Sequence, residues 1–212
     1  DFEGSLKDVS TLISTEKEES FLHTCLFLKA TFLFRLNQVQ EALEVCEKVE
    51  KNLSSDPEVF YLKALCYKQL NKKDKELESL EKAILLGSSI GQYRLSRAAL
   101  LGPDKEQNLR DLNAFCEINT KNSNNQNIRP EYLFSFSKAA QLFLDMNEPQ
   151  RALQLCRMGL AQGEEKYEIW KTQAQALIKL KKIPEAESVI KQAQTWLDEQ
   201  DSRIKLAKQA EP

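Results

Sequence analysis

Apolar residues recur along most of the chain at spacings of three and four, the pattern of helices that bury one face. Paired helical segments are separated by short polar turns that contain an asparagine, namely at Asn37, Asn71 and Asn147. Prolines fall at or just before expected helix starts, where proline is tolerated, at Pro57, Pro149 and Pro184. The pattern therefore predicts an all-α protein built from pairs of helices.

The same order of residue types returns several times along the chain. A small residue is followed three positions later by a large apolar one, as in Ala30 and Leu33, Ala64 and Tyr67, Ala140 and Phe143, and Ala174 and Leu177. From Ala42 to Glu76 is 34 residues, and from Ala152 to Ala186 is again 34. A fixed period of this length predicts a repeat architecture.

This pattern resembles the tetratricopeptide repeat, a helix-turn-helix unit of 34 residues. The slots of the first helix hold Leu26, Ala30 and Leu33; Phe60, Ala64 and Tyr67; Phe136, Ala140 and Phe143; and Trp170, Ala174 and Leu177. Those of the second helix hold Ala42, Cys46 and Val49; Glu76, Leu80 and Ala83; Ala152, Cys156 and Gly159; and Ala186, Ile190 and Ala193. Glu76 departs from the small residue expected in its slot. The resemblance implies a right-handed α-solenoid.

The resemblance covers most of the chain and implies one superhelical domain over residues 1–201. Within it we expect about five units, of which the first is incomplete and the third degenerate. Their ranges are 1–14 for the half-repeat, then 20–53, 57–87, 88–119, 131–163 and 166–198. The asparagine-rich stretch 119–130 predicts an exposed loop, and residues 202–212 predict a C-terminal capping helix or tail. Residue 1 is not a methionine, so we expect a processing boundary there and a chain that begins within a repeat.

Composition and charge narrow the possible partners. The chain has 212 residues, 42% of them apolar, with only six glycines and six prolines, which suits helices. Its 32 acidic and 30 basic residues give a formal net charge of −2, and this balance argues against nucleic acid as a partner. The most apolar stretch, from Phe21 to Leu36, is interrupted by charged residues and is too short to span a bilayer.

The number and spacing of the cysteines indicate the cellular compartment of the protein. The five cysteines form no CxxC pair and lie singly within apolar helical patterns, at positions 25, 46, 66, 116 and 156. Buried, reduced thiols are typical of proteins of the cytoplasm or the nucleus. We therefore expect a cytoplasmic protein, with the nucleus as the alternative.

The sequence holds no catalytic or cofactor motif. Its single histidine, His23, leaves few schemes for acid-base or Cys-His catalysis. Patterns for zinc proteases, serine hydrolases, phosphate loops and dinucleotide-binding loops are missing from the sequence, as are the ligand spacings of calcium loops. We expect no enzyme activity, no cofactor and no metal.

The helix expected from Ser20 to Leu36 is apolar around nearly its whole circumference, so it must be covered on several sides. In proteins of this family the first helices line the concave surface. The resemblance implies that the partner-binding residues are Phe27, Thr31, Phe34, Arg35, Tyr61, Leu65 and Lys68. The groove would then be apolar in its N-terminal half and polar in its C-terminal half.

Two interpretations of Phe27 and Phe34 stay open. They form an exposed surface that holds a helical or extended partner segment, or they are covered by a neighbouring repeat, by the N-terminal half-repeat or by a second copy of the chain. Chaperone-tail-binding members of the family hold a carboxylate with paired Lys and Asn residues. The matching places here hold Phe27, Thr31 and Leu62, which argues against that clamp.

The sequence thus predicts a non-catalytic protein-protein interaction scaffold, a subunit or adaptor of a multiprotein complex that binds a peptide segment in its groove. A co-chaperone-like peptide-binding module and an RNA-binding helical repeat are the alternatives. Self-association through the apolar N-terminal helix is a further expectation.

Overall fold

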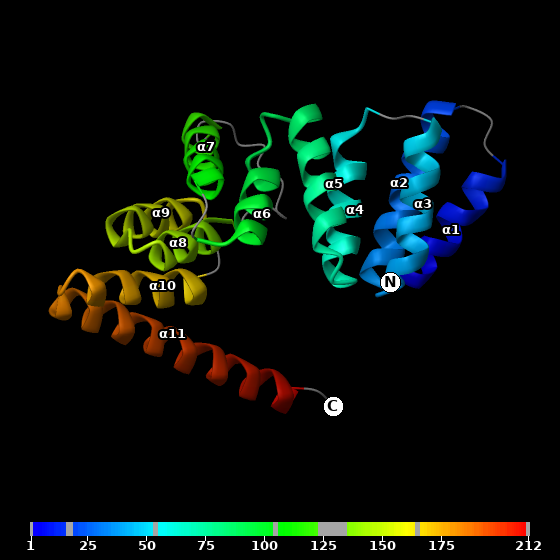
Figure 1. The fold of residues 1–212 in the computed structure, drawn as a ribbon. Coiled ribbons are helices and arrows are strands. Elements are labelled where there is room, and N and C mark those ends of the chain that lie inside the picture. Colours follow the sequence, from blue (N-terminus) through cyan, green and yellow to red (C-terminus); the bar gives the residue numbers. More distant parts are fainter. Residues whose placement is uncertain are drawn as a thin grey trace. The chain divides into compact units, whose positions relative to one another are not determined.

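The computed structural model describes residues 2–15, 19–52, 55–103, 106–122, 135–163 and 166–210, and within these ranges the regular structure is helical throughout. The predicted all-α class is confirmed. Figure 1 labels the helices, which are α1 (Phe2–Thr15), α2 (Glu19–Arg35), α3 (Val39–Asn52), α4 (Pro57–Gln69), α5 (Lys73–Leu86), α6 (Gly91–Leu101), α7 (Glu106–Asn122), α8 (Ser135–Asp145), α9 (Pro149–Ala161), α10 (Lys166–Lys179) and α11 (Ile183–Ala210).

The helices gather into two compact units, residues 1–100 and residues 101–212. The boundary lies at the end of α6, inside the segment 88–119 that the sequence indicates as a degenerate third repeat. The two helices of that segment therefore belong to different units, whereas the resemblance implied a single domain over residues 1–201.

In the first unit, consecutive helices pack against one another: α1 on α2, α2 on α3, α3 on α4 and α4 on α5 (Figure 1). One apolar core joins α2, α3 and α4, and Leu6 of α1 packs against it. The Phe2 ring lies 6.1 Å from the Phe32 ring, so α1 also covers one side of α2. Burial of these apolar faces is the main term that stabilises the unit.

The turns within the helix pairs share one backbone conformation. Asn37, Asn71, Asn147 and Lys181 all have positive φ, between 54° and 62°. Asparagine adopts this left-handed conformation more readily than most residues, which explains its return at three of the four turns. In each case the amide of the next residue bonds back to a carbonyl five residues earlier, as from Lys72 to Tyr67 at 2.9 Å. These bonds satisfy carbonyls that the helix end leaves open.

The small residues of the repeat lie where helices approach most closely. Ala30 and Ala140 are 0% exposed, and Ala64 is 2% exposed. In the second helices, Ala42 and Ala152 are likewise 0% exposed. Two helix backbones can come this close only where neither presents a bulky side chain. The 34-residue pattern therefore encodes the packing of the helix pairs.

In the second unit, α8 packs on α9, α9 on α10, and α10 on both α8 and α11 (Figure 1). Phe115 of α7 meets Phe136 of α8 edge-on, with ring centres 5.8 Å apart, and both rings are almost fully buried. The Trp170 and Trp196 rings, from α10 and α11, make a similar contact at 6.3 Å. Aromatic contacts thus connect successive helices of this unit.

Two segments differ from their expected form. Residues 202–210 are the last part of α11, which continues unbroken from Ile183, rather than a separate capping helix. Helix α7 runs to Asn122, so the first residues of the expected loop 119–130 are helical. The rest of that stretch, residues 123–130, lies outside the described residues, as do the start of the expected unit 131–163 and the last two residues of the tail.

Glu76 is the residue of the first unit that fits its slot least well, and its replacement gives a first prediction. The side chain is 5% exposed, and burial raises the pKa of its carboxyl above the ordinary value of 4.5. Burial disfavours the charged form. We expect Glu76→Ala to increase the free energy of unfolding by about 1 kcal/mol at neutral pH, as measured by urea denaturation followed by circular dichroism.

The pH dependence of this gain has a definite sign. Because the carboxyl binds its proton more readily in the folded state, its destabilising effect is full at neutral pH and disappears as the pH falls through the folded pKa towards 4.5. The advantage of the variant should shrink in the same way. Glu78→Ala is the control, since Glu78 is exposed and pairs with Lys82 at 3.1 Å on the same helix. Equal gains from both variants would contradict the assignment.

Candidate partner-binding face

The exposed side chains of α2 lie on one face of the helix. They are Phe21, Thr24, Leu28 and Arg35 among the residues of α2 whose side chains the structure describes. Their spacing of three, four and seven places them in one row along the helix. Phe21 is 40% exposed and Leu28 is 39% exposed. These four residues, here called the α2 stripe, form a row of two large apolar side chains and a threonine that ends in a cation.

Phe27 and Phe34, the two rings predicted to line the groove, turn further towards the protein interior. Both are half-buried and pack against the core of the first unit, which includes Ala30, Leu33 and Leu62. They lie at the border between this core and the α2 stripe. The core of the first unit therefore covers part of each ring, and both interpretations of these rings stay open.

Thr31 and Arg35 follow the same border. Thr31 is half-buried, and its hydroxyl donates to the backbone carbonyl of Phe27 at 2.9 Å. This local bond satisfies the hydroxyl without a partner from another helix. Arg35 is exposed in the last turn of α2, where a cation interacts favourably with the helix dipole.

On α4, the three predicted residues have different surroundings. The Tyr61 ring lies 4.9 Å from the Tyr93 ring of α6, and its hydroxyl oxygen lies 3.2 Å from Ser96 Oγ and accepts from Gln92 Nε2 at 3.2 Å. Tyr61 is thus held by α6. Leu65 is half-buried, and Lys68 is exposed near the end of α4.

A surface hollow of about 630 Å³ lies at the ends of α2 and α4. One wall is formed by Asn37 and Gln38 of the turn after α2 and by Gln40 of α3. The other is formed by Gln69 at the end of α4 and by Leu70 after it. Arg35 and Lys68 neighbour these two walls in sequence. Amide side chains can both donate and accept hydrogen bonds, so this hollow suits the polar backbone of a peptide.

The sequence interpretation missed Phe21 and Leu28, which are the more exposed apolar residues of α2. They lie seven residues apart, and Arg35 follows seven residues later. That spacing marks one helix face and was visible in the sequence. Because α2 is apolar on nearly all sides, the pattern alone does not show which side the neighbouring helices cover.

Three of the five thiols of the chain are poorly suited to nucleophilic chemistry. Burial raises the pKa of Cys66 to about 12 and that of Cys116 to about 11, and it also raises the pKa of Cys46. The thiolate is the reactive form, so these groups are inert at neutral pH. No group of three or more His, Cys, Asp or Glu side chains that could hold a metal ion occurs in the described parts of the chain.

No helix in the described ranges is long and apolar enough to cross a membrane.

Part of the chain matches a known protein family. The family described as "Anaphase-promoting complex, cyclosome, subunit 3" matches residues 11–83, about a third of the chain. This range contains the end of α1, the helix pair α2 with α3, and α4 with most of α5, and therefore the whole α2 stripe. No curated protein matches the chain.

Solved structures with a similar fold are repeat proteins. A putative kinesin light chain of Podosopora anserina, with nearly identical TPR-like repeats, shares 16% identity with a TM-score of 0.66, over 88% of this chain and 100% of that one. A tetratricopeptide repeat protein of Parabacteroides merdae shares 13% identity with a TM-score of 0.60, over 92% of this chain and 73% of that one.

A third structure is that of YrrB, described as a TPR protein with an unusual peptide-binding site. It shares 16% identity with a TM-score of 0.51, over 85% of this chain and 84% of that one. At these identities the likeness concerns the fold. The resemblance predicted from the sequence is confirmed: the chain has the fold of the tetratricopeptide repeat proteins.

Proposed function

We propose that this protein is a non-catalytic scaffold, a subunit or adaptor of a multiprotein complex in the cytoplasm, that holds a helical or extended segment of a partner protein along the α2 stripe. The observation that carries this proposal is the exposure of two large apolar side chains, Phe21 and Leu28, on one helix face. Contiguous apolar groups on a surface usually mark a site of interaction.

The surroundings of the stripe suit a peptide segment. Phe27 and Phe34 border it and are held by the core, so a partner would meet rings that are already fixed in place. Binding to fixed groups costs less conformational entropy than binding to mobile ones. Arg35 and Lys68 are exposed cations at the ends of two neighbouring helices, and they favour a partner with carboxylates near the end of its apolar segment.

The experiment compares two leucines of the same unit. Leu28→Asp places a charge in the middle of the α2 stripe, and Leu85→Asp makes the same change on α5, where the leucine is 83% exposed. We expect Leu28→Asp to weaken binding at least about ten-fold, because it removes a central apolar contact and leaves a charge to be desolvated. Proteins captured from cell extract would be quantified for wild type and both variants by mass spectrometry.

The outcome distinguishes specific binding at the α2 stripe from non-specific binding through any exposed leucine. A partner that is lost with Leu28→Asp and kept with Leu85→Asp supports the proposal, provided that circular dichroism shows unchanged helix content for both variants. Equal loss with both variants, or loss with neither, contradicts it. Phe27 and Phe34 are less suitable positions, since aspartate there would also disturb the core.

Self-association through α2 is an alternative use of the same surface. Light scattering on the purified chain distinguishes it, because a dimer that becomes a monomer on Leu28→Asp would assign the stripe to a second copy of this chain.

A further inference from the structure

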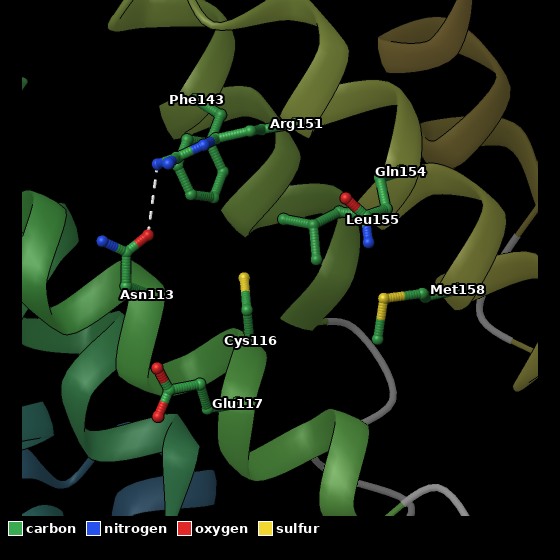
Figure 2. A pocket seen from close by; sticks show the side chains of 8 residues that line it. All are labelled: Asn113, Cys116, Glu117, Phe143, Arg151, Gln154, Leu155 and Met158. Carbon is green, nitrogen blue, oxygen red and sulfur yellow. Dashed lines mark hydrogen bonds between the residues drawn. The ribbon is translucent and has the colours of Figure 1, made fainter.

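A hollow of about 300 Å³ lies in the second unit between α7 and α9, with α8 at its base (Figure 2). It has room for on the order of ten water molecules at roughly 30 Å³ each, and hence for a large side chain. It belongs to the second unit, whereas the α2 stripe belongs to the first.

The base and one wall of this hollow are apolar, whereas four of its eight lining side chains are polar or charged. The Phe143 ring and Leu155 are 1% and 2% exposed and form the base and one wall. Figure 2 shows Met158 on the α9 side and the sulfur of Cys116 pointing from α7 into the space between the two helices. Burial keeps the Cys116 thiol neutral by raising its pKa to about 11, so it too offers an apolar, polarizable surface.

The mouth of the hollow is polar and holds a positioned cation. The Arg151 guanidinium lies over the Phe143 ring, 5.5 Å from its centre, and donates to Asn113 Oδ1 at 3.2 Å. Among the described residues Asn113 is its one hydrogen-bond partner, while a guanidinium has five N–H donors. Arg151 is therefore held in place and retains donors for a carboxylate.

The first unit provides an internal comparison, because its residues correspond to those of the second at an offset of 76. Lys75 lies over the Tyr67 ring at 5.7 Å, just as Arg151 lies over Phe143. Lys82 of α5 pairs with Glu78 on its own helix at 3.1 Å and reaches Glu50 of α3 at 3.7 Å. The ion pair between Lys82 and Glu50 thus joins α5 to α3, the second helices of the two repeats in the first unit.

The second unit has apolar or uncharged residues at the matching positions. Met158 stands in the place of Lys82, Gln154 in that of Glu78 and Leu155 in that of Ser79. Instead of an ion pair between second helices, this unit has the hollow. The aromatic ring and its covering cation are kept, and only the residues that line the space differ.

We propose that the hollow between α7 and α9 is a second binding site, which takes one bulky apolar side chain of a partner peptide, with an adjacent Asp or Glu of that peptide on Arg151. The apolar residues at the base of the hollow select the side chain, and the fixed cation at the mouth selects its acidic neighbour. Glu117, on the α7 side of the mouth, disfavours a second carboxylate. The site thereby prefers a mixed apolar and acidic sequence to a uniformly acidic one.

The test begins with a random peptide library displayed on phage and selected on the full chain, after counter-selection on Met158→Lys. This substitution gives the second unit the residue that the first unit has at the same place, and the position is half-buried. We expect the enriched peptides to share a large apolar residue beside Asp or Glu. A synthetic peptide of that sequence should bind Met158→Lys at least about ten-fold more weakly than wild type.

Two further measurements locate the binding. The chain has only two methionines, so methyl-labelled methionine gives one NMR signal from Met158 in the hollow and one from Met146 outside it. The peptide should shift the Met158 signal and leave that of Met146 in place. Arg151→Gln should weaken binding to a similar extent, whereas Arg157→Gln, an exposed arginine on the same helix, should not.

The competing outcomes are distinct. Peptides that bind wild type and Met158→Lys equally, a library that yields no enriched sequence, or equal effects of the two arginine variants would each overturn the proposal. Leu28→Asp should leave this peptide's affinity unchanged, so failure of the α2 stripe and failure of this site can be told apart.

Discussion

Replacing Phe136 by alanine is expected to lower the free energy of unfolding of the second unit by about 3–5 kcal/mol. The ring is 2% exposed and fills the first aromatic slot of α8, where it meets Phe115 of α7 edge-on at 5.8 Å. Its removal leaves a cavity that fully packed neighbours cannot close. Urea denaturation followed by tryptophan fluorescence measures the effect, because both tryptophans lie in the second unit.

A double-mutant cycle with Phe115→Ala tests whether the ring contact itself contributes. We expect the sum of the stability losses of the two single variants to exceed the stability loss of the double variant by about 0.5–1.5 kcal/mol. Purely additive losses, or a loss below about 1 kcal/mol for Phe136→Ala, would show that α7 is not held on α8 through these rings.

A larger side chain at one of the small-residue positions should destabilise the first unit by overpacking its core, whereas Phe136→Ala leaves a cavity. Ala30 is 0% exposed where α2 contributes to the core with α3 and α4. We expect Ala30→Leu to cost about 1–3 kcal/mol, because the added methylenes force neighbouring side chains or helices apart. Circular dichroism during urea denaturation should show an earlier transition for the first unit, and tryptophan fluorescence should change little.

Ala99→Leu provides the matched control for this substitution. Ala99 is exposed on α6 of the same unit, and the same change there should alter stability by no more than about 0.5 kcal/mol. Similar losses at both positions would mean that the leucine acts through something other than close helix packing.

The parts of the fold that could be predicted from the sequence are those that each repeat specifies by itself. The alanine slots, such as Ala64 and Ala140, and the turn asparagines, such as Asn71, return at a fixed spacing because each serves the packing or the turn of one helix pair. Local requirements of this kind leave a periodic trace in the sequence.

The features that depend on more distant neighbours could not be predicted in the same way. Which side of α2 is covered depends on how α1 and α4 lie against it, and those contacts turn Phe27 towards the core and leave Leu28 exposed. The hollow between α7 and α9 likewise depends on the placement of α7, whose segment matches the repeat poorly. That Met158 lines a hollow becomes apparent only when the positions of both α7 and α9 are known.

The burial of the cysteines has a practical consequence for following how the chain opens. Cys25, Cys46 and Cys66 lie in three successive helices of the first unit, and Cys156 is buried in α9 of the second. A neutral thiol inside a helix pair meets an alkylating reagent only after that pair separates. Brief pulses of reagent, followed by peptide mapping, would therefore record the order in which individual pairs come apart, without any introduced label.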